Sequence, residues 1–317
     1  MEHINRLLAA LDPTAEEQPA AEKAALLATR SQASVELFIC DYDQHLSGER
    51  FFDCQALEKA RQHIIDGHRQ RLQEIADRLK SDVPGAEQLQ IDIDARWDNP
   101  RDDAILRKLS ESGADCLVKD THYHNVLKRS VFSNTDWELI RGCQSRLLLV
   151  KPRPWKEKPV IIVAVDPTHE YDRPASLDRH LLETAASFAF DVGGELHVFH
   201  SCDAATAYAA SADSIAFPVS VPVRELADSM RQHHREAMDE LLKSWDTNII
   251  YQTHFVEGET RETLLALIDQ LGADIVVMGA VSRSAIKRMF LGSTAERVLD
   301  HLPCDLMVVK APAEDAV

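Results

Sequence analysis

The feature that most constrains this chain is an internal repeat. With an offset of 159 positions, residues 106–151 align without gaps on residues 265–310, and 11 of the 46 aligned pairs are identical. The clearest matches are GADCLV with GADIVV and RLLLVK with DLMVVK. Upstream, LLAALDP at 7–13 matches IIVAVDP at 161–167 with an offset of 154. Self-similarity at one long period indicates that a single supersecondary unit has been built twice.

Each copy alternates short apolar runs with longer helical patterns. In residues 55–80, apolar side chains recur at steps of three to four residues, which predicts a helix. Such alternation predicts a parallel sheet covered on both faces. The expected strands lie at 4–11, 35–41, 89–95, 115–119 and 146–151 in the first copy, and at 160–165, 195–200, 249–256, 274–278 and 305–310 in the second. We therefore expect an α/β fold of two tandem, doubly wound, Rossmann-like domains with five-stranded parallel sheets, which bind ligands at the carboxyl ends of their strands.

A short linker is expected between the two copies. A length of 317 residues allows roughly two domains. The stretch KPRPWKEKP, residues 151–159, is rich in proline and charge, as stiff linkers are. We place an N-terminal domain at 1–154 and a C-terminal domain at 155–317. The Ala- and Ser-rich segment 203–222 fits neither pattern, and is expected to be a flexible excursion or a lid over a ligand.

Composition argues against several partners. The formal net charge of −17 disfavours nucleic acids and anionic membranes as direct partners, because both would be repelled. No apolar run approaches the roughly 18 residues of a membrane-spanning helix, and Asp12-Pro13 interrupts the start too early for a signal peptide. The six cysteines form no C-x-x-C pair, as expected for buried thiols in a reducing compartment. We expect a cytoplasmic protein with a small molecule as its partner.

The stretch MGAVSRSAIKRMFLGSTAERVL, residues 278–299, has the composition of a phosphate site. Gly279 follows an apolar strand, where a ligand or backbone segment can approach without a Cβ in the way. A predicted helix then starts with Gly292, Ser293 and Thr294. The free N–H groups of a helix start can hold a phosphate. Three basic residues lie in the connecting loop: Arg283, Lys287 and Arg288. A strand, a turn and a capped helix without any ligand would give the same pattern, so these residues alone leave both interpretations open.

The same stretch resembles the ATP-binding motif of the universal stress proteins, G-x2-G-x9-G-[ST]. Here it reads Gly279-x2-Ser282-x9-Gly292-Ser293, and only the middle glycine differs. The resemblance extends to Val163-Ala164-Val165-Asp166 and to Leu196-His197-Val198. The tandem arrangement, with TDWELIR at 135–141, is most similar to the E type of that family.

This resemblance implies an adenine nucleotide hydrolase-like fold that binds ATP or another adenine nucleotide, alone or with Mg²⁺, in the C-terminal domain. In the family, the Asp after the first strand contacts adenosine, the residue matching Val198 lines the adenine pocket, and the glycine loop wraps the phosphates. The site residues so implied are Ala164, Val165, Asp166, Val198, Met278, Gly279, Ser282, Arg283, Gly292, Ser293 and Thr294. Ser282 is expected to weaken binding without abolishing it, because a left-handed backbone costs a non-glycine residue roughly 1 kcal/mol or more.

The first copy lacks this glycine motif. At the aligned positions it has Asp120, Tyr123 and Ser133-Asn134. The carboxylate of Asp120 would oppose an anion, so we expect no ATP there, while another ligand or a purely structural role stays open. Asn134 and Thr135 are predicted to cap the next helix, Thr135 together with Glu138 at capping-box spacing. His122 and His124 could bind zinc with Asp120, although loop histidines are commonly solvated.

Motifs of fast catalysis are missing from the sequence, which has no G-x-S-x-G elbow, Walker A motif or H-E-x-x-H. We expect a nucleotide-binding sensor or regulator of the stress response. A slow ATP hydrolase or phosphotransferase, and a nucleotide-free structural or metal-binding interaction module, stay open as alternatives. His233-His234 is predicted to face solvent, and His200 to be a packing residue that could edge the nucleotide pocket.

The fifth strands, 147–150 and 306–309, are short and apolar. Unpaired apolar edges promote aggregation, so we expect these strands to pair, and the two domains to form an intramolecular pair that imitates a dimer. Two independent domains, and a homodimer of whole chains, stay open.

Overall fold

The computed structural model describes residues 3–46, 54–124, 129–131, 133–168, 175–204, 223–280 and 302–311. Their contacts group into two compact units. The N-terminal unit consists of residues 3–154 with 305–308. The C-terminal unit contains residues 155–304 and the residues that follow 308.

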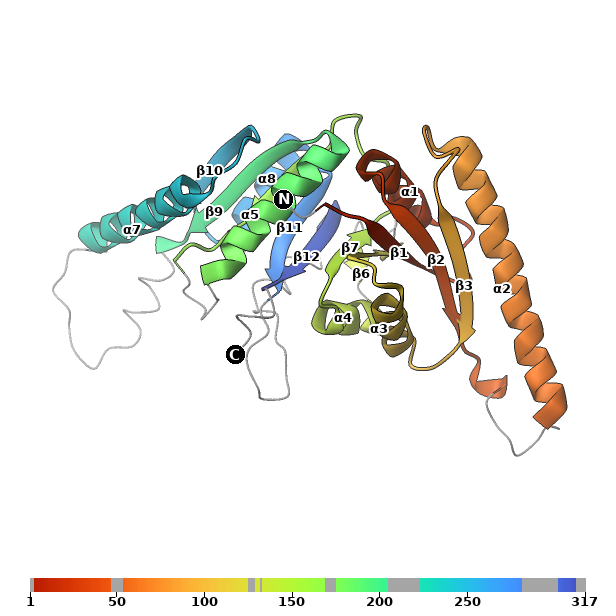
Figure 1. Cartoon of the computed structure of the whole chain (residues 1–317). Coiled ribbons are helices and arrows are strands. Elements are labelled where there is room, and N and C mark those ends of the chain that lie inside the picture. Colours follow the sequence, from red (N-terminus) through yellow and green to blue (C-terminus); the bar gives the residue numbers. More distant parts are fainter. Residues whose placement is uncertain are drawn as a thin grey trace, which may run out of the picture. The chain divides into compact units, whose positions relative to one another are not determined.

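Five parallel strands form the central sheet of the N-terminal unit, in the order β3-β2-β1-β4-β7 (Figure 1). They are β1 (Arg6–Leu11), β2 (Ser34–Asp41), β3 (Ile91–Trp97), β4 (Cys116–Asp120) and β7 (Arg146–Val150). Most residues of β1, β2 and β7 are buried and apolar, as expected for a sheet covered on both faces. Strand order reverses between β1 and β4, which is where a doubly wound sheet opens a crevice for ligands.

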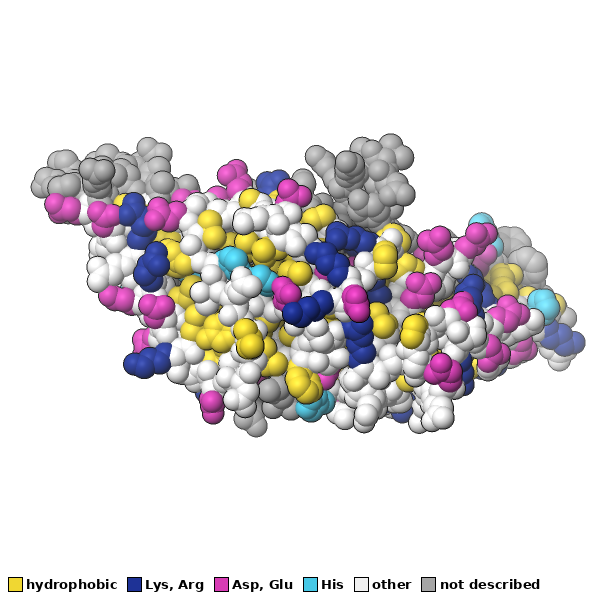
Figure 2. All heavy atoms as spheres, turned by 90° about the horizontal axis from the view of Figure 1, so that it is seen from above, with side chains coloured by type: hydrophobic (Ala, Val, Ile, Leu, Met, Phe, Trp, Pro, Cys, Tyr) yellow, Lys and Arg dark blue, Asp and Glu magenta, His cyan; other side chains and the backbone are white. Residues whose placement is uncertain are grey.

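Two pairs of helices cover this sheet: α1 with α2, and α3 with α4. They are α1 (Pro19–Ser31), α2 (Cys54–Asp82), α3 (Arg101–Ser112) and α4 (Asn134–Gly142), with a 3-10 turn η1 (Gln44–Leu46) before α2. The predicted helix 55–80 is confirmed as α2. Figure 2 shows acidic and basic side chains interleaved over the part of the surface near α2, at the right of the view. Pairs such as Arg69 with Asp66, one turn apart, account for part of this pattern.

The cap of α4 differs from the prediction. Ser133 is the N-cap residue, and its hydroxyl accepts from the amide of Asp136. The Asp136 side chain binds the Ser133 amide at 2.7 Å and so completes a capping box. The box predicted for Thr135 and Glu138 was wrong, because the helix begins with Asn134 and the N3 position falls on Asp136.

Three further strands contribute to the N-terminal unit, β12 (Asp305–Lys310) through its residues 305–308. Strands β5 (His122–His124) and β6 (Arg129–Val131) form an antiparallel pair. Strand β12 runs antiparallel to β7, with Leu306 opposite Leu149 and Val308 opposite Leu147. This ladder confirms the predicted pairing of the fifth strands, while the packing of two whole domains around it stays a prediction.

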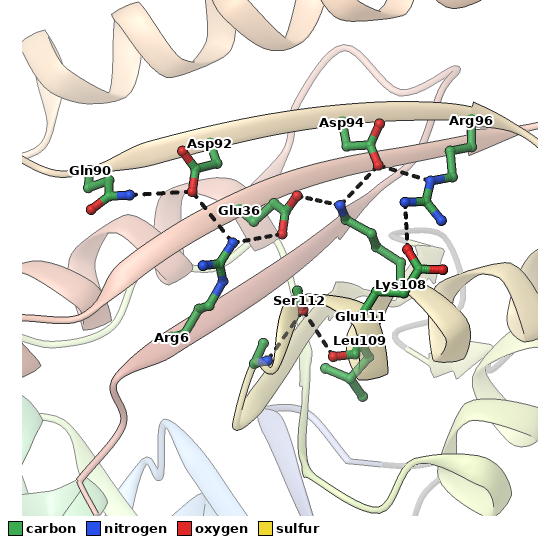
Figure 3. A network of polar contacts seen from close by, with 11 residues as sticks. Arg6, Glu36, Gln90, Asp92, Asp94, Arg96, Lys108, Leu109, Glu111 and Ser112 are labelled. Carbon is green, nitrogen blue, oxygen red and sulfur yellow. Dashed lines mark hydrogen bonds and ion pairs between the residues drawn. The ribbon is translucent and has the colours of Figure 1, made fainter.

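A polar network lies on one face of β1, β2 and β3 (Figure 3). Lys108 of α3 lies 2.5 Å from Glu36 and 2.9 Å from Asp94, and Arg6 donates to Glu36 at 3.1 Å. Burial acts to raise the pKa of Asp94, but the bonds and charges of Lys108 and Arg96 outweigh it, so this pKa is lowered. The network therefore holds its charges in pairs on the polar face of β2 and β3.

The C-terminal unit repeats the same plan. Its parallel strands have the order β10-β9-β8-β11 (Figure 1). They are β8 (Val160–Ala164), β9 (Glu195–Cys202), β10 (Tyr251–Glu257) and β11 (Ile275–Ala280), and the helices are α5 (Ala175–Val192), α7 (Val223–Ser244) and α8 (Thr260–Leu271). The predicted α/β class is confirmed. No helix within the described ranges combines the length and the apolar character needed to cross a membrane.

Candidate functional site

The predicted nucleotide site draws its residues from three neighbouring strands of the C-terminal unit. Strand β8 lies between β9 and β11. Strand order reverses between β8 and β11, so their carboxyl ends form the crevice in which such sheets bind ligands. Three of the predicted residues are half-buried at this edge: Ala164, Asp166 and Met278. The fold therefore brings the end of the first strand and the start of the glycine motif to one place.

Asp166 begins a turn that both copies share. The Thr168 hydroxyl donates to Asp166 Oδ1 at 3.1 Å. In the N-terminal unit, the amide and the hydroxyl of Thr14 donate to Asp12 Oδ1 at 2.7 and 2.6 Å. The hydrogen bond from the Thr14 amide fixes an Asx turn at Asp12, and at Asp166 the threonine hydroxyl makes the corresponding side-chain bond. On α5, Oδ1 of Asp178 also accepts from the Asp166 amide at 3.0 Å, which fixes the path of the chain as it leaves β8.

Gly279 has a packing reason that does not involve a ligand. A Cβ at this position would lie 2.9 Å from Cδ2 of Leu177 and 3.3 Å from Cδ1 of Leu181, both on α5. Carbon atoms prefer separations of roughly 3.5–4.0 Å, so β11 approaches α5 this closely only because the residue is glycine. That Gly279 also admits a ligand stays a prediction.

His200 connects the edge of the site to α7. Val198 is fully buried, whereas His200, two residues later on β9, reaches the backbone just beyond β8. Its Nδ1 lies 3.0 Å from the carbonyl oxygen of Val165, and its Nε2 lies 2.9 Å from Nδ1 of His234. A carbonyl oxygen only accepts, so Nδ1 of His200 carries a proton and His234 donates to Nε2 of His200. One hydrogen-bonded chain thus runs from a predicted site residue to α7.

The position of His234 corrects the sequence-based expectation. His233 is exposed, as predicted, but His234 is 5% exposed and is stacked against His200. The pKa of His200 is lowered, mainly by burial and further by His234, against the effect of its bond to Val165. His200 is therefore neutral around pH 7, and acid, which protonates it, disfavours this buried arrangement.

Several predicted site residues lie outside the described residues: Ser282, Arg283, Gly292, Ser293 and Thr294. The same holds for residues 205–222 of the unassigned segment and for the side chains of His122 and His124. Among the residues that the structure does describe, no group of three or more His, Cys, Asp or Glu side chains could hold a metal ion.

The corresponding edge of the N-terminal unit contains a cavity of about 280 Å³. It lies at the carboxyl ends of β1 and β4, which are neighbours as β8 and β11 are. The starts of α1, α3 and α4 complete its wall. Its polar lining residues include Asp12, Arg101, Lys119, Asp120, Ser133 and Thr135. This N-terminal cavity occupies the position at which the second copy is predicted to hold its nucleotide.

Asp120, which stands where the second copy has Gly279, caps a helix. Its Oδ1 accepts from the amide of Ala20 at 2.7 Å, in the first turn of α1. The N-cap residue of that helix, Gln18, makes no side-chain capping bond. Burial raises the pKa of Asp120 to about 7, although the bond from Ala20 and the charge of Lys119 act to lower it. A carboxyl group at a helix start occupies a place that attracts anions, which gives a physical reason for expecting no ATP in this copy.

Two side chains that the sequence analysis did not single out hold the loop beside this cavity. Gln18 donates through Nε2 to the carbonyl oxygens of Asp12 and Ala15, at 2.8 and 2.9 Å. Arg71 of α2 donates to the carbonyl oxygen of Pro13 at 2.5 Å and also to that of Ala15. Neither residue belongs to a motif, so no local signal in the sequence could have revealed these long-range contacts.

Comparison with known proteins identifies the family. The model of the Universal stress protein family matches residues 159–310. One relative is 31% identical over 315 residues, which are 98% of this chain and 95% of the relative. The chain therefore belongs to the universal stress protein family. That relative is Universal stress protein E of Escherichia coli strain K12. A Universal stress protein E homolog of Haemophilus influenzae is 24% identical over 318 residues, 98% of this chain and 99% of the relative.

Solved structures share the fold along nearly the whole chain. A functionally unknown protein from Pseudomonas aeruginosa PAO1 matches with a TM-score of 0.70 and 22% identity, over 97% of this chain and 93% of that one. A universal stress protein from Archaeoglobus fulgidus matches with a TM-score of 0.65 and 15% identity, over 97% and 99%. At these identities the likeness concerns the fold, and it confirms the predicted fold class.

Proposed function

We propose that the C-terminal unit binds ATP or a related adenine nucleotide at the carboxyl ends of β8, β9 and β11, and that the protein acts as a nucleotide-dependent sensor or regulator in the cytoplasmic stress response. The observation that carries this proposal is the spacing Gly279-x2-Ser282-x9-Gly292-Ser293. Its first glycine lies at the switch point of the sheet, beside the strand that leads to Asp166. The turn anchored at Asp166 and the helix start predicted at Gly292 would suit the two ends of a nucleotide, because the free N–H groups of a helix start can hold a phosphate.

Regulation suits this site better than rapid chemistry. The turn after β8 is fixed by its own hydrogen bonds, from Thr168 to Asp166 and from Asp166 to Asp178. A displacement of Val165 on nucleotide binding would reach α7 through the hydrogen bonds that join Val165, His200 and His234. A change of state in a sensor requires a difference in binding free energy between two conformations, and this chain of buried contacts offers a route for it. Slow hydrolysis by the same site remains the second candidate.

Isothermal titration of the full chain with ATP tests the proposal. We expect one site per chain. Asp166→Asn keeps an acceptor for Thr168 but removes the charge, and it should weaken binding. Asp12→Asn makes the same change in the equivalent turn of the first copy and serves as the matched control, with unchanged affinity. Two equal sites, no binding, or the same loss in both variants would contradict the proposal.

A second measurement separates the sensor from the slow hydrolase. The full chain is incubated with ATP and Mg²⁺ for hours, and ADP is quantified by chromatography. A sensor should leave the ATP intact. The thermal unfolding midpoint of the protein should nevertheless rise with ATP concentration, since a ligand that binds only the folded state stabilises that state. ADP formation that is lost in Asp166→Asn would favour the hydrolase.

A further inference from the structure

The N-terminal cavity is a prepared site whose ligand the nucleotide proposal does not supply. Its loop is held by Gln18 and by Arg71, so that three carbonyl oxygens of residues 12–15 are fixed before any ligand arrives. Its volume of about 280 Å³ is close to the lower end of the range for small-molecule pockets, roughly 300–1,000 Å³. The cavity therefore suits a compact molecule.

The lining of the N-terminal cavity contains both acidic and basic side chains. Its acidic residues are Asp12, Glu17 and Asp120, and Asp12 is close enough for its charge to raise the pKa of Asp120. Oδ1 of Asp120 is used by Ala20, whereas Oδ2 is shielded from solvent and accepts no hydrogen bond within the described ranges. Asp120 therefore offers the cavity an acceptor that still lacks a donor, which is costly for a buried group.

The lining of the cavity also offers positive charge. Arg101, at the start of α3, lines the cavity and has no ion-pair partner among the described residues. The start of α4 also lines it through Ser133 and Thr135, and a helix start carries partial positive charge. Lys119 adds little, because its Nζ lies 2.6 Å from Oδ1 of Asp136, a fully buried carboxylate.

We propose that this cavity binds a small zwitterion of the amino acid class, with its ammonium group toward Asp120 and Asp12 and its carboxylate toward Arg101 and the start of α4. An ammonium group supplies the donor that Oδ2 lacks, and a guanidinium binds a carboxylate through two parallel hydrogen bonds. A polyanion such as ATP would place charge against both aspartates. The assignment is independent of the nucleotide site in the C-terminal unit.

Proton release gives this assignment a signature of its own. With a pKa of about 7, Asp120 is roughly half protonated at neutral pH. A cation nearby favours the ionised carboxylate and lowers its pKa. Binding of the zwitterion at pH 7 should therefore release about half a proton per site, and at pH 8 only about a tenth, because most of Asp120 is then ionised beforehand while the ligand keeps its ammonium group.

The test is isothermal titration of the full chain with each of the twenty common L-amino acids at millimolar concentration, in two buffers of different ionisation enthalpy. The strongest binder is then compared with the amine that lacks its carboxylate and with the acid that lacks its amino group. Two variants remove one pole each: Asp120→Asn, which keeps an acceptor for the Ala20 amide, and Arg101→Gln. Arg107→Gln is the matched control, because Arg107 lies on the same helix, is exposed and pairs with Asp98.

We expect one amino acid at least to bind once per chain, and both single-charge analogues to bind at least tenfold more weakly. Asp120→Asn and Arg101→Gln should each weaken binding at least tenfold, Asp120→Asn should also abolish the proton release, and Arg107→Gln should change neither. Circular dichroism and melting curves check that the variants are folded. Absence of binding by all twenty amino acids, binding of the amine alone as tightly as its amino acid, or unaltered affinity in both folded variants would overturn the assignment.

Discussion

Replacement of Lys23 by Met tests how β12 is held in the N-terminal unit. Nζ of Lys23 lies 2.5 Å from Oδ2 of Asp305 and 2.9 Å from the carbonyl oxygen of Lys151, and the two charged side chains are only 7% and 2% exposed. Met has a similar length but no charge, so the variant leaves Asp305 buried without the charge of Lys23, while the Lys151 amide still donates to Oδ1 of Asp305 at 2.9 Å. Removal of one member of a buried ion pair costs about 3–5 kcal/mol. We expect a loss of that size in the free energy of unfolding.

Urea denaturation followed by circular dichroism measures the loss. With a slope of roughly 3 kcal/mol per molar urea, 3–5 kcal/mol moves the midpoint down by about 1–1.7 M. Lys158→Met is the matched control, because Lys158 forms a 3.0 Å pair with Glu195 in which both side chains are largely exposed. Such surface pairs contribute about 0–1 kcal/mol, so the control should stay near the wild-type midpoint.

A double variant separates the pair from its burial. Lys23→Met with Asp305→Asn removes both charges, keeps an acceptor for the Lys151 amide and should recover most of the stability, since replacement of a buried ion pair by uncharged residues of similar size is commonly neutral or stabilising. A shift for Lys23→Met no larger than that for Lys158→Met would refute the reasoning. It would mean that the pair does not hold β12 in solution.

Three further predictions concern the C-terminal unit and α4. The pKa of His200 is lowered in the folded state, so below about pH 6.5 the unfolded chain binds more protons, and stability is lost as pH falls toward the folded-state pKa. The melting temperature should therefore be lower at pH 5.5 than at pH 7.5, and His200→Gln should reduce this difference in melting temperature. Gly279→Ala should lower the free energy of unfolding by about 1–3 kcal/mol through overpacking against Leu177. Urea denaturation should show a smaller loss when the same change is made in the Leu177→Ala variant. Ser133→Ala should cost about 0.5–2 kcal/mol through loss of the α4 cap, and a cost below that range would contradict the assigned capping box.

Hydrophobic patterning accounts for the part of the fold that the sequence predicted well. The expected strands 89–95 and 249–256 appear as Ile91–Trp97 and Tyr251–Glu257, and the other strand positions agree as closely. Apolar runs report burial directly, because every residue of a doubly covered strand lies in the core. The boundaries of helices and strands are predicted less accurately from sequence, since they depend on single hydrogen bonds such as the one that caps α4 at Ser133.

Side-chain contacts between distant segments escaped the sequence analysis for a different reason. His234 lies in a polar helix, and nothing in the helical period marks it as the position that meets His200. The bond from Ala20 to Asp120 joins residues a hundred positions apart, so a feature that looked like a lost anion site proved to be a helix cap. Patterns along one segment cannot contain such information, because it depends on how two segments pack.

The two copies have therefore diverged by exchanging one close contact for another. At the shared position, Gly279 lets β11 approach α5, and Asp120 instead supplies the acceptor for the first turn of α1. A glycine at position 120 would remove the opposing charge, but it would also leave the Ala20 amide without this acceptor. The turn that begins at Asp12 would survive the change, because its bonds to Thr14 are local. A single substitution at the shared position is consequently not expected to give the first copy the nucleotide site proposed for the second, since the start of α1 is capped by the carboxyl group of Asp120.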